Sequence, residues 1–258
     1  MEKVIDFVQP KGKWKFNEEV AKCFDNMLER SIPDYQNMRK LEKLIINNSV
    51  SNKHTLLDIG CSNGINIDDF CNDMKCYGID ISEPMLQQAR ERFVKNNNVV
   101  IEQFNILTGL NSLCGKIGVE GFDIITSVLT IQFTPIEYRQ SILSDIYNHL
   151  NKNGVFIFVE KILGSDNVIN NMLVKSYYDI KSDNGYSYDA INRKKKSLEG
   201  VLVPVTSNWN RDLLKQAGFT KMETFWKCLN FEDKICRYVL WNRWFSFSFK
   251  FCSIRMCI

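Results

Sequence analysis

The chain of 258 residues carries 33 Lys and Arg residues against 30 Asp and Glu residues, a formal net charge of +3. Its hydrophobic fraction of 45% and charged fraction of 24% are typical of a folded domain, which excludes disordered, collagen-like and disulfide-knot proteins. The charge is too small to make nucleic acid the expected partner. This length suits one domain with one core.

The cysteines and the N-terminus indicate a cytoplasmic protein. None of the nine cysteines forms the CxxC spacing of a zinc site, and an odd number of scattered thiols is typical of a reducing compartment. The N-terminal residues lack the apolar region of a secretion signal, and no apolar run approaches the ~18 residues of a membrane span. We therefore expect neither export nor a membrane partner.

Two helices are predicted at the N-terminus, followed by alternating strands and helices. Apolar residues recur at helical spacing from Glu18 to Glu29 and from Gln36 to Ile46. A short apolar strand from Thr55 to Ile59 then runs into a glycine-containing turn. Cys76 to Ile79 is predicted as a second strand, and Ser82-Glu83-Pro84 opens the next helix.

The alternation continues through the middle of the chain. Val99 to Phe104 and Phe122 to Val128 are predicted strands, and Ile136 to Leu150 is a predicted amphipathic helix. A turn from Asn151 to Gly154 precedes a continuous apolar strand from Gly154 to Glu160. These repeated strand–helix units predict a doubly wound α/β fold with a mostly parallel sheet.

The C-terminal part departs from this alternation. A polar, mainly helical segment at about residues 162–200 is expected to be an insertion over one edge of the sheet. Asn208 to Gln216 predicts a helix that Gly218 ends, and Glu223 to Phe231 with Lys234 to Leu240 predicts a closing hairpin. We divide the chain into an N-terminal helical cap at 1–50, a main domain at 51–241, and a tail at 242–258 of alternating phenylalanines with no assignable role.

The segment from Leu56 to Gly64 carries the strongest functional signal. Gly60 and Gly64 lack Cβ atoms, so backbone N–H groups in this turn can approach a ligand closely, next to the start of a helix. Their GxxxG spacing differs from the GxGxxG fingerprint of NAD-binding proteins. Asp80 follows about twenty residues later at the end of a strand, where its carboxylate can accept hydrogen bonds from ribose hydroxyls. The alternative is an ordinary turn with a helix-capping aspartate.

Histidine-based acid–base chemistry has little support in this sequence. His54 precedes the first strand and His149 ends a helix, so both are expected on the surface. Cys61 has no neighbouring histidine or cation to activate its thiol, and we interpret it as a small turn residue.

With these motifs the chain resembles the carboxy-S-adenosyl-L-methionine synthase family of class I S-adenosylmethionine-dependent methyltransferases. The motifs that carry the resemblance occur in order from about Phe16 to Tyr238. They are Phe24 to Met27, Arg30 to Tyr35, Asp58 to Ser62, Ile79-Asp80, Pro84-Met85, Leu129 to Phe133, Glu160-Lys161, Asn184 to Ser187, Lys196 to Glu199, Ala217 to Phe219 and Asn230-Phe231.

The resemblance implies a seven-stranded Rossmann-like methyltransferase fold and a cytoplasmic, homodimeric enzyme. Such an enzyme binds S-adenosyl-L-methionine (SAM) and converts it into carboxy-S-adenosyl-L-methionine (carboxy-SAM), which serves wobble-uridine modification in tRNA. Its small-molecule substrate, prephenate, supplies the carboxyl group. Carried over by position, Tyr35 contacts the methionine part, Gly60, Cys61 and Ser62 form the loop beneath it, Asp80 holds the ribose with Ile81 beside it, and Asn105 and Ile106 flank the adenine.

The chain departs from the family's pattern at three of the expected cofactor-binding positions. Asn105 stands where the family has aspartate, and Val128 stands where the family has an asparagine that contacts the ligand. Lys195 aligns with the arginine that holds the extra carboxylate, and lysine has no bidentate fork. The basic run from Arg193 to Lys196 is alternatively a solvated surface or, less favoured, a phosphate-binding patch for RNA.

Three functions are compatible with the sequence. The first is an enzyme of this family that uses SAM or carboxy-SAM. The second is a SAM-dependent methyltransferase acting on another acceptor, a small molecule or tRNA, since a sulfonium methyl group is already activated and mainly needs alignment. The third is a catalytically inactive partner protein with the methyltransferase fold.

Overall fold

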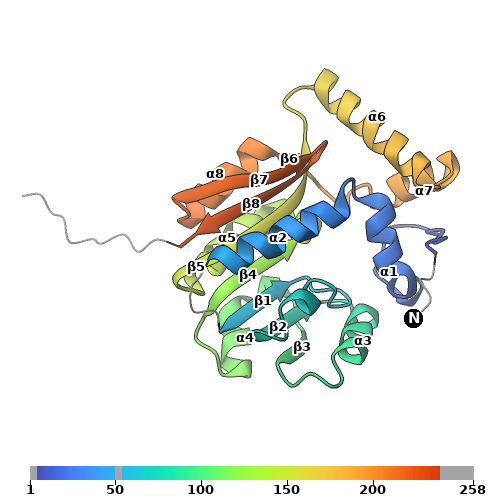
Figure 1. The fold of residues 1–258 in the computed structure, drawn as a ribbon. Helices are drawn as coiled ribbons and strands as arrows, with labels where there is room; N and C mark the ends of the chain where they lie inside the picture. The colour runs from blue at the N-terminus through green and yellow to red at the C-terminus, as the bar shows by residue number, and fades with distance from the viewer. Residues whose placement is uncertain (1–4, 50–53, 239–258) are drawn as a thin grey trace, which may run out of the picture.

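A twisted sheet with helices on both faces forms the centre of the computed structural model, which describes residues 5–49 and 54–238 (Figure 1). The strands are β1 (Thr55–Ile59), β2 (Lys75–Asp80), β3 (Val99–Gln103), β4 (Phe122–Val128), β5 (Leu150–Leu163), β6 (Val205–Thr206), β7 (Lys221–Cys228) and β8 (Phe231–Arg237). The α-helices are α1 (Glu18–Ser31), α2 (Tyr35–Ser49), α3 (Glu83–Arg92), α4 (Leu110–Ile117), α5 (Ile136–Asn148), α6 (Asn167–Asp183), α7 (Tyr188–Leu198) and α8 (Ser207–Ala217). Short 3-10 helices are η1 (Ile67–Asp69), η2 (Ile106–Thr108) and η3 (Ile131–Phe133).

The strand order is that of a doubly wound sheet with an antiparallel addition. The continuous order is β3-β2-β1-β4-β5-β8-β7, and the short β6 pairs with the end of β5. Strands β1 to β5 pair in parallel, whereas β8 runs antiparallel to both of its neighbours. The predicted fold class is confirmed. The seven expected strands form the continuous order, and the two-residue β6 is additional.

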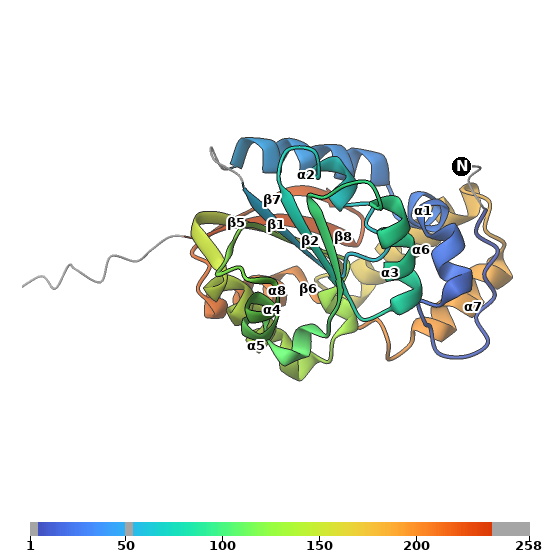
Figure 2. The same cartoon turned by 90° about the horizontal axis from the view of Figure 1, so that it is seen from below.

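Alternate residues of the central strands pack on opposite faces of the sheet, as a period of two requires. Leu57, Ile125 and Phe156 pack with α4, α5 and α8 on one face. Their neighbours Leu56 and Ile124 pack with α2 on the other face. Figure 2 shows α2 along one face and α4, α5 and α8 along the opposite one.

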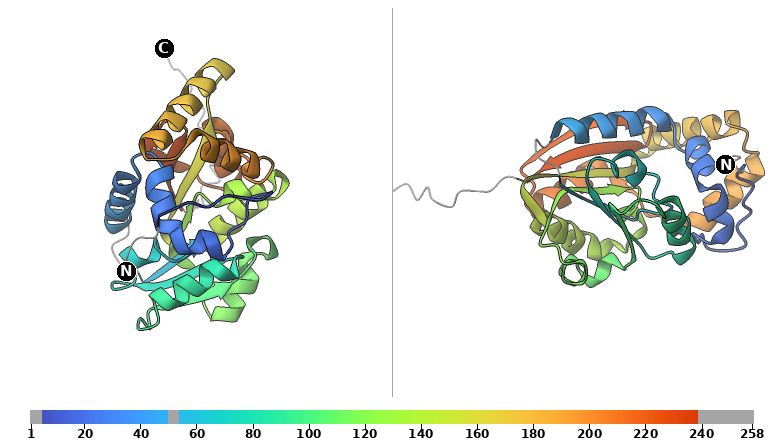
Figure 3. Two further views of the ribbon diagram at one scale, coloured as in Figure 1. Left: turned by 90° about the vertical axis from the view of Figure 1, so that its right-hand side faces the viewer. Right: turned by 60° about the horizontal axis from the view of Figure 1, so that its bottom comes forward.

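The N-terminal segment, α1, α6 and α7 gather where the parallel strands end (Figure 2). Viewed from that end, α1 lies between α3 on one side and α6 with α7 on the other (Figure 3). Two hydrogen bonds join the end of α1 to the end of α6: Arg30 Nε donates to the Asn184 carbonyl oxygen at 2.8 Å, and Asn184 Nδ2 donates to the Arg30 carbonyl oxygen at 3.1 Å. This end of the sheet is where α/β proteins hold their ligands.

The local sequence signals predict most element ends correctly. Asn17 and Ser82 accept hydrogen bonds from the first turns of α1 and α3, and Pro84 lies in the first turn of α3. Gly218 ends α8 in the left-handed conformation, as predicted. The hairpin of β7 and β8 is also present, although its turn lies at Leu229-Asn230, so the first predicted strand was too long.

Two further predictions were wrong. The predicted turn from Asn151 to Gly154 lies within β5, because a bulge with Asn153 at a φ of 66° lets the strand begin at Leu150. His149 is buried rather than exposed. Its Nδ1 lies 2.8 Å from the Asp145 carbonyl oxygen in the last turn of α5, and its Nε2 lies 3.0 Å from Asn111 Oδ1 in α4. The imidazole ring therefore links the end of α5 to α4.

The seven cysteines within the described residues are free thiols. No helix within residues 5–49 and 54–238 has the length and apolar character that crossing a membrane requires. The alternating phenylalanines of the tail lie outside the described residues.

Candidate functional site

A cavity of about 440 Å³ lies at the carboxyl ends of β1, β2, β4 and β5. Its size is typical of a small-molecule site. Side chains of α1, α7 and the N-terminal segment cover it, among them Phe24, Leu198 and Trp14. Nine of the ten predicted cofactor-binding residues line this cavity: Tyr35, Gly60, Cys61, Ser62, Asp80, Ile81, Asn105, Ile106 and Val128.

The turn after β1 uses its backbone N–H groups within the protein. The N–H groups of Gly60 and Cys61 both donate to the Ile79 carbonyl oxygen, at 2.8 and 2.9 Å. The Ser62 N–H donates to Asp80 Oδ2 at 3.0 Å, and the Gly64 N–H donates to the Cys61 carbonyl oxygen at 2.8 Å. The prediction that these N–H groups face a ligand was therefore wrong.

Gly60 is required by its packing as well as by its place on the cavity wall. Its φ of +73° is unfavourable for other residues, and a Cβ atom would lie 2.2 Å from Thr130 Oγ1. Cys61 beside it is 2% exposed, and burial raises the pKa of its thiol well above the usual value. This agrees with the interpretation of Cys61 as a turn residue without a reactive thiolate.

Asp80, at the end of β2, presents its carboxylate to the cavity. Its Oδ1 accepts from the Ser82 N–H at 2.9 Å, and its Oδ2 accepts from the Ser62 N–H at 3.0 Å. Burial raises the pKa of Asp80, and these backbone N–H groups oppose that shift by stabilising the carboxylate. A carboxylate accepts about four hydrogen bonds, so each oxygen retains the capacity for one ribose hydroxyl.

An apolar part of the wall adjoins Asp80. Ile81 is 68% exposed and Leu107 is 41% exposed, although both side chains are large and apolar. Both line the cavity together with Ile106 and Phe104. Asn105 Oδ1 accepts a hydrogen bond from the Leu107 N–H at 3.0 Å and so caps the start of η2. The amide oxygen keeps one lone pair that can accept a second hydrogen bond. This surface suits a flat aromatic base.

Part of the cavity wall, called the basic end below, carries lysine side chains, but the predicted Lys195 is not one of them. Lys195 is exposed on α7 and does not line the cavity, whereas Lys194 does. Adjacent residues on a helix point about 100° apart, so only one of the two faces inward. The Lys194 ammonium lies 4.6 Å from the Trp14 ring centroid, and burial lowers its pKa to about 8.

Lys161 is a second cation at the basic end and was not among the predicted site residues. It follows the apolar part of β5, and its ammonium lies 4.4 Å from the ring centroid of Tyr177, which also lines the cavity. Burial lowers the pKa of Lys161 to about 8. Ligand sites of α/β proteins lie at the carboxyl ends of the parallel strands. The position of Lys161 near the end of a predicted strand could therefore have identified it from the sequence.

Polar groups under the turn form the floor of the cavity. Asp58 is 2% exposed and accepts from Thr126 Oγ1 at 2.7 Å and from Asn66 Nδ2 at 3.3 Å. Burial raises the pKa of Asp58 to about 6. Beside this floor, Arg39 donates to the Ile65 carbonyl oxygen at 2.8 Å and pairs with Asp69.

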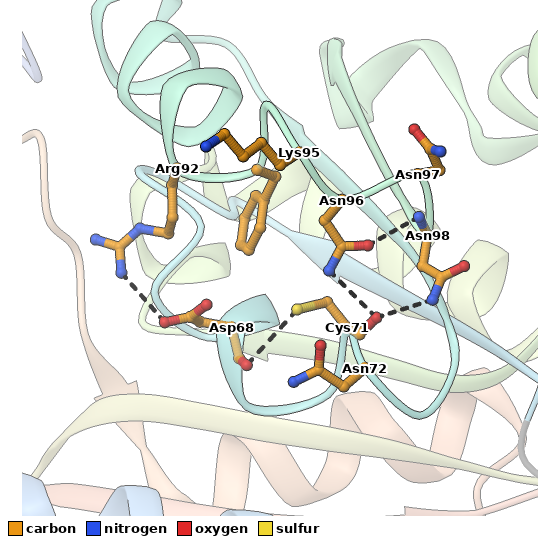
Figure 4. A pocket seen from close by; sticks show the side chains of 9 residues that line it. Asp68, Cys71, Asn72, Arg92, Lys95, Asn96, Asn97 and Asn98 are labelled. Atoms are coloured by element: carbon orange, nitrogen blue, oxygen red, sulfur yellow. Dashed lines mark hydrogen bonds and ion pairs between the residues drawn. The ribbon is translucent and has the colours of Figure 1, made fainter.

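A second depression, of about 460 Å³, lies between the loop after η1 and the loop after α3 (Figure 4). Its polar groups already bond to one another: Asn96 and Asn98 both donate to the Cys71 carbonyl oxygen, at 3.4 and 3.2 Å, and Arg92 faces Asp68 at 3.6 Å. None of the predicted site residues lines it. The cavity at the strand ends is therefore the candidate site.

Comparison with known proteins supports the same assignment. A model of the methyltransferase domain matches residues 57–156. Over 241 residues the chain is 32% identical to carboxy-S-adenosyl-L-methionine synthase 1 of Yersinia pseudotuberculosis serotype IB (strain PB1/+), with 92% of this chain and 99% of that protein covered. A carboxy-S-adenosyl-L-methionine synthase of Helicobacter pylori (strain Shi470) is 33% identical, with 86% and 93% covered.

The chain belongs to the carboxy-S-adenosyl-L-methionine synthase family.

Solved structures support the fold assigned to this synthase-family chain. An O-methyltransferase family protein from Burkholderia thailandensis superposes with a TM-score of 0.61 at 12% identity, covering 85% of this chain and 59% of that one. Haemonchus contortus phosphoethanolamine N-methyltransferase 2, in complex with SAM, gives a TM-score of 0.56 at 15% identity, covering 89% and 61%. The synthase-family chain thus spans less than two thirds of either structure, and at these identities the likeness concerns the fold alone.

The cavity of this synthase-family protein fits SAM. Its wall combines the carboxylate acceptors of Asp80 with the apolar side chains of Ile81 and Ile106, the two kinds of surface that a ribose and an aromatic base require. Within residues 5–49 and 54–238, no group of three or more His, Cys, Asp or Glu side chains is placed to hold a metal ion.

Proposed function

We propose that the protein converts SAM into carboxy-SAM, with prephenate as the carboxyl donor. The chain's membership of the synthase family supports SAM as the nucleoside substrate. The observation that carries the rest is that one cavity is lined both by the Asp80 carboxylate, at the end of β2, and by the ammonium groups of Lys161, three strands away in β5, and Lys194 on α7. A cationic sulfonium nucleoside and an anionic carboxyl donor suit a cavity with charged groups of both signs.

The protein's own residues bind and align rather than exchange protons. SAM supplies its methyl carbon, and the positive charge of the adjacent sulfur makes the C–H bonds of this methyl group more acidic. In the overall reaction a C–H bond of that methyl group breaks and a C–C bond to the carboxyl carbon forms. Prephenate loses this carboxyl group and its ring hydroxyl, which leaves as water with the methyl proton, and becomes the aromatic monocarboxylate phenylpyruvate. The apolar cover of Trp14, Phe16 and Phe24 excludes bulk water from the cavity.

The direct test is the mass of the nucleoside product. Purified protein incubated with SAM and prephenate should yield carboxy-SAM, detected by mass spectrometry, with phenylpyruvate in equal amount. Methyl transfer to another acceptor, with S-adenosylhomocysteine as the nucleoside product, would favour the methyltransferase alternative. No turnover with any acceptor would favour a catalytically inactive partner protein.

Lys194, rather than Lys195, should hold the added carboxylate of carboxy-SAM. A well-placed charge-assisted hydrogen bond contributes ~1.5–3 kcal/mol, so Lys194→Ala should weaken carboxy-SAM binding about tenfold or more. SAM, which lacks that carboxylate, should bind within about twofold of its wild-type affinity. Calorimetric titration with both nucleosides measures the difference.

Lys195→Ala is the matched control for this prediction, since it removes the same charge from the adjacent, exposed position. It should leave both affinities unchanged. A Lys195→Ala effect larger than that of Lys194→Ala would contradict the assignment.

We also infer a homodimer that works in the cytoplasm, with carboxy-SAM destined for tRNA wobble-uridine modification. The dimer is supported by a group of exposed apolar side chains at the end of β5 and on α6: Leu163, Val168, Ile169 and Met172. Such a patch suits a second copy of the chain. A single monomeric species in sedimentation equilibrium would contradict the dimer. Direct RNA binding is not favoured, because Lys194 points into the cavity and only part of the basic run remains exposed.

A further inference from the structure

Three lysines from separate elements meet at the basic end of the cavity. Lys161 comes from β5, Lys181 from α6 and Lys194 from α7. Lys161 and Lys194 line the cavity, whereas Lys181 lies behind the cavity-lining Tyr177. Within residues 5–49 and 54–238, none of the three forms an ion pair with a carboxylate.

Lys181 is the most deeply buried of these lysines, at 4% exposure. Its ammonium lies 5.7 Å from the ring centroid of Tyr177 and 4.8 Å from that of Tyr186. Because Lys161 lies 4.4 Å from the Tyr177 centroid, the electron-rich ring of Tyr177 faces two ammonium groups. Tyr177 thus connects Lys181 to the cavity wall.

Stability alone does not explain an ammonium group at this position. A buried charge without a counter-ion is costly, and contacts with aromatic rings offset only part of that cost. The charged groups that face Lys181 are mostly cationic: Lys161, Lys194 and Arg30, against the single carboxylate of Asp6. Burial first, and then Lys194 and Lys161, lower the pKa of Lys181 to about 7. The cluster has an excess of positive charge that an incoming anion can balance.

We propose that Lys181 is a positioning residue that gives the donor subsite of Lys161 and Lys194 its preference for a dianion over a monoanion. This inference rests on the proposed function and concerns how the same cavity selects its carboxyl donor. Prephenate carries two carboxylates, and the phenylpyruvate that it leaves carries one. Lys181 acts through Tyr177 and through its charge, without touching the donor. A subsite selective in this way retains the substrate and releases the product.

Binding experiments without turnover test this proposal. Protein saturated with S-adenosylhomocysteine, which lacks the reactive methyl group, is titrated calorimetrically with prephenate and with phenylpyruvate. Lys181→Met should weaken prephenate about tenfold and phenylpyruvate about threefold, because the loss of one cation costs a dianion more than a monoanion. Lys181→Arg should restore most of the selectivity, and S-adenosylhomocysteine affinity should stay unchanged in both variants.

The matched control is Lys175→Met, which removes an exposed lysine from the same helix and should change neither affinity. Thermal unfolding adds a readout that separates the two possible roles. If Lys181 serves the donor, Lys181→Met should keep or raise the unfolding temperature, because an unpaired buried ammonium is replaced by an apolar side chain. A lower unfolding temperature with unchanged selectivity would make Lys181 a structural residue and overturn the proposal.

The pH dependence of binding provides a second readout. An anion stabilises the charged forms of lysines whose pKa values are lowered, so prephenate should bind with proton uptake and weaken as the pH rises through about 7 to 8. This slope should be smaller in Lys181→Met. Equal weakening of both anions, or no prephenate binding to the wild-type protein, would overturn the proposal. Selective prephenate binding without carboxy-SAM formation would refute the proposed function and leave the dianion preference intact.

Discussion

Replacing Gly60 by valine should lower the free energy of unfolding by about 2–5 kcal/mol, from the left-handed backbone and from overpacking together. The left-handed φ of +73° is unfavourable for a β-branched residue, and the new Cβ atom would meet Thr130 Oγ1 at 2.2 Å. Because Thr130 lies in the segment after β4, the clash forces apart two segments of the cavity wall. Chemical denaturation measures the effect.

Gly115→Ala is the matched control for the glycine substitution. Gly115 lies within α4, and a Cβ atom there would meet nothing within 4 Å. Alanine in a helix interior is favoured over glycine by about 0.5–1 kcal/mol, so this variant should be slightly more stable than the wild type. A Gly60→Val protein with wild-type stability and no SAM affinity would mean that the glycine serves only the ligand. The contact with Thr130 argues against that outcome.

Asp80→Ala should weaken SAM binding about 100-fold or more, since two charge-assisted hydrogen bonds of ~1.5–3 kcal/mol each are lost. The substitution also leaves the Ser62 and Ser82 N–H groups without their acceptor, which loosens the turn beneath the ligand. Asp80→Asn keeps the shape but turns one acceptor into a donor, and it should weaken binding to a similar extent. Calorimetry with SAM measures both affinities.

Asp73→Ala, which removes an exposed acid from the loop after η1, should bind SAM as the wild type does. The unfolding temperature of Asp80→Ala establishes that the measured protein is folded. SAM affinity within a few-fold of wild type in both Asp80 variants would rule out the ribose assignment.

Much of the fold was accessible from the sequence because its signals are local. Short continuous runs of apolar residues identify β1, β4 and most of β5, and caps such as Ser82 and Gly218 identify helix ends. The bulge at Asn153 was not accessible, because the chain there has turn-forming residues and is held in the strand by its pairing with β4. α4 also went unpredicted, since its eight residues are too few for a clear helical period.

The site residues that lie at the ends of predicted strands, such as Gly60 and Asp80, could be identified from the sequence, because ligands of α/β proteins bind at the carboxyl ends of the strands. Sequence position alone does not tell whether Lys194 or Lys195 faces the cavity, because the rotation of α7 about its axis decides this. Lys181 was not predictable, since its surroundings come from α1, α6, α7 and the N-terminal segment. Buried acids such as Glu42 and Asp233, whose carboxylate oxygens have no hydrogen-bond partner among the described residues, likewise depend on tertiary packing.

The two hydrogen bonds to the Ile79 carbonyl oxygen disfavour ligands that carry phosphate groups at this turn. Turns that bind phosphate groups do so with unoccupied N–H groups at a helix N-terminus. Here the N–H groups of Gly60, Cys61, Ser62 and Gly64 all donate within the protein, so these four groups offer a polyphosphate no donor. ATP, which shares adenosine with SAM, should therefore compete poorly in a displacement titration. Because these hydrogen bonds form when the protein folds, the conformational entropy of ordering the turn is lost during folding. Binding of a nucleoside without phosphates then does not have to order the turn, which favours its affinity.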